Sequence, residues 1–210
     1  MPTLYGVYRS RASRNFWLAN ELGIELELVP VTQAYRDGAK GMLTTSPEFL
    51  TLSAAGAIPV LQDGDLVLSE SLAINLYLAR KYGGPLAPKG ATEDALMQQW
   101  AFYSVTAIEP AALAIMFAFN ENRGDGPDVA ENADTLLRPL RVLQAHLAAQ
   151  GQMVGSRFTV ADINMAEILR YAQNHPTLLA GFPAVDAWLK ACQARPAFQD
   201  MWAKRMAEPA

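Results

Sequence analysis

The spacing of hydrophobic residues changes near residue 90 of this 210-residue chain. Before that point, short segments that alternate apolar and polar residues, as strands do, are interleaved with segments of helical spacing. After it, every apolar segment has the spacing of a helix, beginning with 93–120. Residues 83–92 contain three glycines and two prolines, which favours a linker. The pattern predicts an α/β domain over residues 1–82, a linker over 83–92 and an all-helical domain over 93–210.

The first 82 residues predict a small mixed sheet. Two strand-like segments, 3–8 and 24–29, flank a segment of helical spacing that covers 13–22 and ends before Gly23. A strand–helix–strand unit within one sheet implies parallel strands joined by a right-handed crossover. Further along, Asp63-Gly64 lies between two short apolar runs, which is the strongest short-range hairpin signal. The hairpin would extend the sheet with antiparallel strands, and another helix follows it.

Composition and charge exclude several classes of partner. The net charge is −4 and the Lys and Arg residues form no cluster, so we expect no nucleic-acid partner. The first residues lack the features of a signal peptide, and the longest apolar run, 111–119, is too short to span a membrane. A lone cysteine, Cys192, leaves no disulfide, and two distant histidines show no metal-ligand spacing. We expect a cytoplasmic protein without a metal, nucleic-acid or membrane partner.

Two short motifs flank the predicted hairpin. Ile58-Pro59 precedes its first strand, where a cis proline would let Ile58 present its N–H and C=O to an extended peptide. Ser69-Glu70-Ser71 follows its second strand and opens a helix, so a ligand carboxylate could bind the free N–H groups beside Ser71. Glu70 would then hold the ammonium group of the ligand. Each motif also has a plain structural explanation, with Pro59 ending a loop and Ser69 acting as an N-cap.

Taken together, the motifs of this chain resemble a known family. The run 56–78, GAIPVLQDGDLVLSESLAINLYL, closely resembles the glutathione-binding segment of cytosolic glutathione S-transferases. Thr159 and Asp162 resemble that family's capping box, and 182–188 followed by Arg195-Pro196 resembles its C-terminal helices. The resemblance implies the glutathione S-transferase fold, with an α/β thioredoxin-like N-terminal domain and an all-α C-terminal domain, usually paired as a homodimer. Within the family, the chain resembles the bacterial, serine-type members of theta-, zeta- and beta-like classes.

The resemblance also implies a binding site for glutathione, which would act as the co-substrate with no metal. Ile58 would pair with the cysteinyl backbone of glutathione, and Pro59 would be cis. Glu70 and Ser71 would hold the γ-glutamyl end.

The predicted binding site for the glycyl end of glutathione departs from the family pattern in this chain. Ala57 stands where many relatives carry Lys or Arg. Lys40 or Gln33, in the polar segment after the second strand, would serve as a substitute.

The catalytic group implied by the resemblance is a hydrogen-bond donor near the first helix, because the thiolate of glutathione is the nucleophile. Ser10-Arg-Ala-Ser13 resembles the Ser-x-x-Cys/Ser pattern of the theta and zeta classes, in which the first serine is catalytic. This makes Ser10 the leading candidate. Ser13 is the second, at the position of a cysteine in beta-like classes, although it also lies where an N-cap would. Tyr5 and Tyr8 are further candidates.

The long helix that begins near residue 93 predicts the pocket for the second substrate. Phe102, Thr106, Glu109 and Leu113 share one face at helical spacing, and Glu109 is either a proton acceptor or a structural carboxylate. The leading function is therefore a glutathione S-transferase that joins glutathione thiolate to small hydrophobic electrophiles, as in detoxification. The alternatives are a glutathione-dependent isomerase, dehalogenase or disulfide reductase, and a non-enzymatic interaction module of the same fold.

Overall fold

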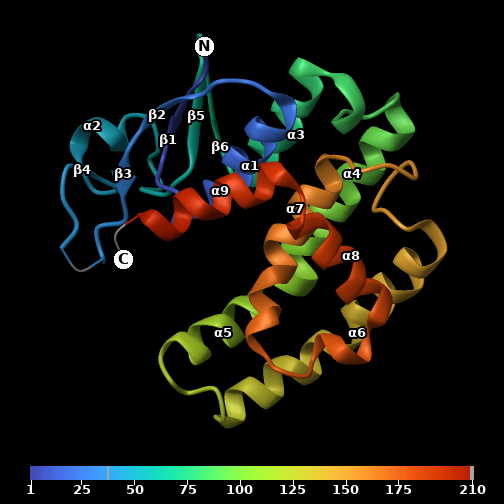
Figure 1. The fold of residues 1–210 in the computed structure, drawn as a ribbon. Coiled ribbons are helices and arrows are strands. Elements are labelled where there is room, and N and C mark those ends of the chain that lie inside the picture. Colours follow the sequence, from blue (N-terminus) through green and yellow to red (C-terminus); the bar gives the residue numbers. More distant parts are fainter. Residues whose placement is uncertain (37, 209–210) are drawn as a thin grey trace. The chain divides into compact units, whose positions relative to one another are not determined.

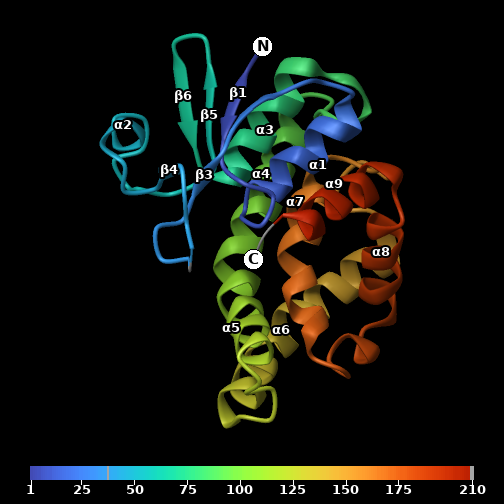
Figure 2. The same ribbon diagram turned by 60° about the vertical axis from the view of Figure 1, so that its left-hand side comes forward.

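The computed structural model describes residues 1–36 and 38–208. Its contacts divide the chain into two compact units, Met1–Gly84 together with Pro196–Ala210, and Pro85–Arg195. Figures 1 and 2 show the ribbon from two directions. The first boundary lies within the linker expected over residues 83–92. The predicted helical domain, 93–210, differs at its end, because residues from Pro196 onward belong to the first unit; residues 209 and 210 lie outside the described part.

A four-stranded mixed sheet forms the centre of the first unit, in the order β2-β1-β5-β6. Its strands are β1 (Thr3–Tyr5), β2 (Glu27–Val29), β5 (Val60–Asp63) and β6 (Leu66–Ser69). β1 pairs in parallel with β2 and antiparallel with β5, and β5 pairs with β6 as a hairpin. The predicted strand–helix–strand unit and hairpin are both confirmed. Two further strands, β3 (Val31–Thr32) and β4 (Met42–Leu43), form a separate parallel pair.

The helices that lie between or after the strands in the sequence of the first unit are α1 (Ser13–Leu22), α2 (Pro47–Leu50) and α3 (Ser71–Tyr82). α1 ends as predicted at Gly23, which takes the left-handed conformation with φ 65° and donates its N–H to Ala19 and Asn20. One core cluster consists of Val31, Phe49 and Val60, which are fully buried. Tyr5 and Ile58 pack against this cluster, so the core supports the end of β5 at which the predicted glutathione motif begins.

The last helix, α9 (Pro196–Ala207), packs against α1 in the first unit (Figure 1). The rings of Trp17 and Phe198 meet edge to face with centroids 4.9 Å apart. Asn20 donates from Nδ2 to the carboxylate of Asp200 at 2.9 Å and to the carbonyl of Ala197 at 3.2 Å. The hydrophobic spacing of this segment predicts a helix, but it does not indicate the surface on which the helix packs.

The second unit is helical throughout its regular elements. These are the short η1 (Gly84–Leu86), which begins at the last residue of the first unit, then α4 (Ala91–Tyr103), η2 (Ser104–Ile108), α5 (Glu109–Asn120), α6 (Pro127–Gln150), α7 (Val160–Leu169), η3 (Arg170–Asn174), η4 (Leu179–Gly181) and α8 (Pro183–Gln193). All ten residues of α7 are buried, which makes it the central helix of this unit.

A π-helical turn, η2, interrupts the long helix predicted from residue 93. Pro110 has no N–H to donate to the carbonyl of Thr106, and its ring would clash with that carbonyl in a regular helix. The chain therefore widens by one residue, and Glu109 donates its N–H to Ser104, five residues back.

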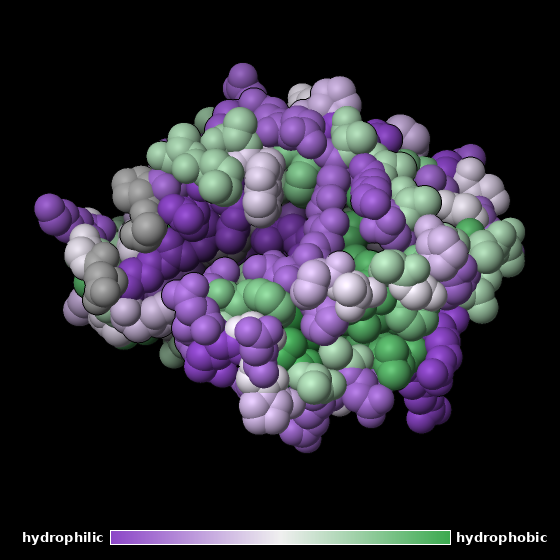
Figure 3. Space-filling model, turned by 60° about the horizontal axis from the view of Figure 1, so that its bottom comes forward, coloured by the Kyte–Doolittle hydropathy of each residue, from purple (hydrophilic) through white to green (hydrophobic). Residues whose placement is uncertain are grey.

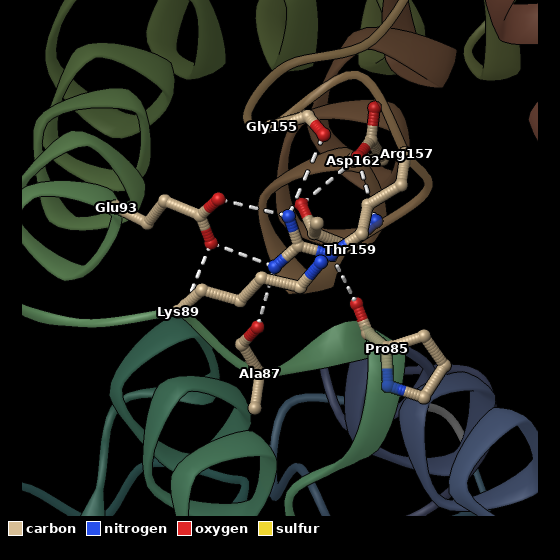
Figure 4. A network of polar contacts seen from close by, with 8 residues as sticks. All are labelled: Pro85, Ala87, Lys89, Glu93, Gly155, Arg157, Thr159 and Asp162. Carbon is tan, nitrogen blue, oxygen red and sulfur yellow. Dashed lines mark hydrogen bonds and ion pairs between the residues drawn. The ribbon is translucent and has the colours of Figure 1, made fainter.

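Hydrogen bonds around the start of α7 tie it to the start of α4 (Figure 4). The predicted capping box is confirmed, since Asp162 accepts from the N–H of Thr159 at 2.8 Å. Next to it, the Arg157 guanidinium binds both carboxylate oxygens of Glu93, at 2.9 and 2.7 Å. Arg157 also donates to the carbonyls of Pro85 and Ala87. These bonds hold the segment before α4 against the loop before α7 within the second unit.

The continuous helical run Ala91–Asn120 has the length and apolar composition of a membrane-crossing helix, with mean hydropathy 1.6 in its most apolar window. The run 111–119, judged too short from the sequence, is thus part of a longer helix. The core helix of a globular domain meets the same criterion, and Ile108, Ala112 and Ile115 are fully buried here. The face drawn in Figure 3 is largely hydrophilic, with separate hydrophobic patches. A single helix of this kind is weak support for a membrane span.

Candidate functional site

The register of the β5–β6 hairpin brings the two predicted binding motifs to the same end of the sheet. Val60, the first residue of β5, pairs with Ser69, the last residue of β6. Pro59 precedes Val60 and Glu70 follows Ser69, so antiparallel pairing places the two motifs opposite each other. Since Ile58 lies beyond the paired part of β5, its peptide groups are at a position where an extended ligand could continue the ladder.

The peptide bond between Ile58 and Pro59 is cis, as expected. Pro59 is buried, whereas Ile58 and the preceding residue Ala57 keep some exposure. Ala57 is fixed by Ser53, whose hydroxyl donates to its carbonyl at 3.1 Å and accepts from its N–H at 3.3 Å. Ser53 therefore orders the approach to the cis bond through the Ala57 backbone.

The N-cap of α3 is Glu70 rather than Ser69, which was the N-cap in the alternative, purely structural explanation of this motif. Ser69 remains in β6 because it pairs with Val60. Glu70 turns the chain from strand to helix with φ 69° and ψ 108°, a conformation that non-glycine residues seldom adopt. Its side chain is exposed, while that of Ser71, the first residue of the helix, is buried. A charged acceptor thus stands beside a helix start whose N–H groups favour an anion.

A buried polar cluster lies beneath the start of α3. Arg14, only 1% exposed, donates from Nη1 to the Ser71 hydroxyl at 3.1 Å. Asn15 donates from Nδ2 to the Ser71 carbonyl at 2.9 Å and to Asn75 Oδ1 at 2.7 Å. Asn75 in turn donates to the Arg14 carbonyl at 3.2 Å. α1 and α3 are therefore joined by polar contacts at the point where the sequence predicts that glutathione binds.

Arg14 was not among the binding residues predicted from the sequence. A lone arginine on a surface-like helix is usually solvated, so its residue type alone did not point to this site. One signal was available: Ser13, Arg14 and Asn15 form three successive polar residues in a helix that is otherwise apolar on its inner face. The structure buries all three and brings a guanidinium charge to the N-terminal end of α3, which strengthens that end as an anion site.

The two candidate serines differ in exposure. Ser10 lies in the loop between β1 and α1, retains 8% exposure, and uses its hydroxyl to donate to the Val7 carbonyl at 2.7 Å and accept from the Ala12 N–H at 3.0 Å. Ser13 is fully buried as the first residue of α1, and the N-cap position belongs to Ala12 rather than to Ser13. Both side chains are largely buried, with Ser10 slightly more exposed than Ser13. Which of the two serines is catalytic stays a prediction.

The two candidate tyrosines have other contacts. Tyr5 lies in β1 and donates its hydroxyl to Gln62 Oε1 at 3.0 Å. The ring of Tyr8 stacks on Phe16 with centroids 3.9 Å apart. Burial raises the pKa of Tyr8 above its usual value, with the Asp200 and Glu208 carboxylates adding to the rise and Lys204 opposing it. Tyr8 therefore stays protonated as a neutral phenol at neutral pH.

The predicted residues for the glycyl end of glutathione lie after β3. Lys40 is exposed in the segment between β3 and β4, and Gln33 is partly buried directly after β3. Their part in binding stays a prediction.

The four residues predicted to line the second-substrate pocket lie before, within and after the π turn. Phe102 is 67% exposed in α4, and Thr106 donates its hydroxyl to the Phe102 carbonyl at 2.8 Å. Glu109, at the start of α5, is only 8% exposed, and Leu113 is partly buried. The extra residue in the π turn interrupts the regular spacing on which a single shared face was predicted. Their role in substrate binding stays a prediction.

Among the described residues, no group of three or more His, Cys, Asp or Glu side chains could hold a metal ion.

Comparison with known proteins identifies both parts of the chain. Residues 4–86 match the family described as Glutathione S-transferase, N-terminal domain, and residues 107–196 match Glutathione S-transferase, C-terminal domain. Glutathione S-transferase 3 of Zea mays is 36% identical, covering 93% of this chain and 90% of the relative. A probable glutathione S-transferase of Oryza sativa subsp. japonica is 33% identical, covering 99% of this chain and 98% of the relative.

Solved structures of glutathione S-transferases have the same fold as this chain. The theta class glutathione S-transferase of Xanthomonas axonopodis pv. citri, solved with glutathione bound, has a TM-score of 0.82 at 27% identity, with 95% of each chain covered. Glutathione S-transferase III in its apo form has a TM-score of 0.81 at 36% identity, covering 100% of this chain and 99% of the other. The sequence relatives from Zea mays and Oryza sativa are plant proteins, so they do not support the bacterial subgroup expected above. The chain belongs to the glutathione S-transferase family, whose members are transferase enzymes.

Proposed function

We propose that this glutathione transferase binds glutathione at the ends of β5 and β6 and joins its thiolate to small hydrophobic electrophiles. The observation that carries the proposal is the placement of the cis Ile58–Pro59 bond opposite Glu70-Ser71 across the hairpin. One motif suits an extended peptide backbone, and the other suits a group that bears both a carboxylate and an ammonium. Glutathione has both of these features within one tripeptide.

The binding contacts follow from the chemistry of each residue. Ile58 pairs its backbone with the cysteinyl residue of glutathione. The γ-glutamyl carboxylate lies at the start of α3, where Ser71 and the Arg14 charge favour it, and the exposed Glu70 carboxylate binds the γ-glutamyl ammonium. Lys40 or Gln33 serves the glycyl carboxylate in place of the basic residue absent at Ala57.

The chemical step requires a thiolate. In our proposal the Ser10 hydroxyl turns its proton from the Val7 carbonyl to the sulfur anion when glutathione binds. This hydrogen bond, aided by the positive end of α1, stabilises the thiolate. The thiol proton leaves to solvent, and the thiolate electron pair forms a C–S bond to the electrophile. With an aryl chloride, the C–Cl bond breaks and chloride departs with its electron pair. Each unit by which the pKa of the glutathione thiol falls corresponds to about 1.4 kcal/mol of preference for the thiolate over the thiol.

The class, assembly and setting are also part of the proposal. We propose a serine-type transferase because Ser10 is the leading candidate donor, and a cytoplasmic homodimer because the resemblance favours that assembly. Phe102, Thr106, Glu109 and Leu113 are proposed to contact the electrophile. Size-exclusion chromatography with light scattering tests the dimer, and cell fractionation tests the location.

Glutathione-agarose tests the central proposal. We expect retention of the protein and elution by free glutathione, followed by activity on a chloronitrobenzene electrophile. The Glu131→Gln variant, altered at an exposed position on α6, is the matched control and should behave as the wild type. Failure of the folded wild type to bind glutathione would refute the proposed function. Binding without conjugation would favour an isomerase, dehalogenase or reductase, or a module that does not catalyse.

A further inference from the structure

Charged side chains from outside the loop hold the backbone of residues 8–10, which leads to the candidate catalytic serine. Glu208 accepts from the N–H of Tyr8 at Oε1 and from the N–H of Arg9 at Oε2, both at 2.8 Å. The guanidinium of Arg9 donates back to the Glu208 carbonyl at 3.0 Å. A single carboxylate directly after α9 thus holds two successive amides of the loop between β1 and α1.

The carbonyl groups of the same loop are bound by guanidinium groups. Arg205, in the last turn of α9, donates from Nη1 to the Tyr8 carbonyl at 2.5 Å and to the Ser10 carbonyl at 3.3 Å. Arg36 donates to the Arg9 carbonyl between them. Hydrogen bonds to charged partners are about twice as strong as those between neutral groups. Residues 8–10 are therefore held by a clamp, which we define as Glu208, Arg205 and Arg36.

The positions of Arg205 and Glu208 depend on α9, which packs on α1 through the Trp17–Phe198 contact and the Asn20–Asp200 hydrogen bond. The loop lies between β1 and α1, and both of these elements belong to the same unit as α9. Residues 205–208 are thus fixed relative to the helix that Ser10 precedes.

We propose that Glu208 and Arg205 are positioning residues for Ser10. This inference rests on the proposed function, in which the Ser10 hydroxyl donates to the glutathione thiolate. The direction of that hydroxyl depends on the loop backbone, because its present partners are the Val7 carbonyl and the Ala12 N–H. Without the clamp the loop samples more conformations, and fewer of them point the hydroxyl at the sulfur. The binding of glutathione depends instead on residues of other segments, Ile58, Glu70 and Ser71.

Glu208→Gln tests this proposal with little change in shape. The amide keeps one oxygen acceptor but turns an NH₂ group toward one of the two loop N–H groups. We expect kcat to fall roughly ten-fold, equivalent to about 1.4 kcal/mol, with the glutathione Kd changed by less than about two-fold. The ultraviolet absorbance of bound thiolate should titrate at higher pH. Among the described residues, the titratable and charged groups at this loop include Tyr8, Arg9 and Arg11 of the loop itself, Arg36, and Asp200, Lys204, Arg205 and Glu208 in the chain's last helix or directly after it.

A double-mutant cycle separates positioning from general stability. If Glu208 acts through Ser10, then Glu208→Gln has no further effect on kcat in a Ser10→Ala background. Glu131→Gln is the control for the substitution itself, and Arg205→Lys, carried through the same cycle, replaces Glu208→Gln if that variant fails to fold. An equal loss of kcat in both backgrounds overturns the proposal while the proposed function stands. A Ser10→Ala variant of unchanged rate overturns the proposal and removes Ser10 from the chemical step, while glutathione binding and conjugation stand. Wild type that does not bind glutathione overturns the proposed function, and this inference with it, before any variant is compared.

Discussion

The Arg14 guanidinium offers a direct test of the proposed γ-glutamyl site. It lies 3.1 Å from the Ser71 hydroxyl, so a ligand carboxylate bonded to that hydroxyl would lie about 6 Å from the charge. Two unit charges at that distance attract each other by roughly 0.7 kcal/mol in bulk water and about 2.8 kcal/mol at an effective dielectric constant of 20. The site is buried, so we expect the upper part of this range to apply.

Arg14→Met should therefore weaken glutathione binding by roughly 10- to 100-fold, since each 1.4 kcal/mol is a factor of ten in Kd. Arg14→Lys keeps the positive charge but loses the planar fork, and should retain most of the affinity. Isothermal titration calorimetry measures both Kd values, and circular dichroism shows whether the variants fold. Arg141→Met, at an exposed position on α6, is the control for the substitution.

A folded Arg14→Met protein with a Kd within two-fold of wild type would refute the argument. It would show that the guanidinium only joins α1 to α3 and does not contribute to an anion site. Loss of affinity in Arg14→Lys equal to that in Arg14→Met would instead assign the effect to the geometry of the Ser71 bond rather than to charge.

Three other predictions concern the catalytic loop and the second unit. Ser10→Ala should lower kcat by about ten-fold or more, and Ser13→Ala should leave it closer to wild type, as steady-state kinetics can measure; equal rates in both variants and wild type would remove serine from the mechanism. Asp162 accepts from the N–H groups of Thr159 and Met153 and from Trp188 Nε1, so Asp162→Ala should cost about 3 kcal/mol or more of unfolding free energy by leaving buried donors unpaired, measured by urea denaturation; a loss below about 1 kcal/mol would contradict this. Arg157 and the Lys89 N–H lower the pKa of Glu93 from 4.5 to about 2, so the stability that this carboxylate contributes is present above pH 4.5 and is lost as pH falls toward 2. The melting temperature of Glu93→Gln should accordingly lie below that of wild type at pH 7 and approach it near pH 2; a constant difference at both pH values would argue against the assignment.

Local patterns determined much of this protein directly from the sequence. Hydrophobic period separated an α/β part from a helical part, and Asp63-Gly64 located the hairpin because few turns other than the tight hairpin turns favour that pair. The cis bond at Pro59 and the capping box of Thr159 and Asp162 were expected from short motifs together with the family resemblance. Each depends on backbone geometry within a few residues, which side-chain type and spacing can specify.

Features that depend on contacts between distant segments were decided only by the tertiary structure. The helical spacing of α9 does not indicate which surface it covers, and its contacts with Trp17 and Asn20 are about 180 residues away in sequence. The same holds for Arg14, whose proposed role arises when α1 packs beside α3 and its guanidinium reaches the Ser71 hydroxyl. Glu208 gives the clearest case, because a carboxylate near the end of the chain has no local partner pattern, yet the fold brings it within hydrogen-bonding distance of two amides beside Ser10.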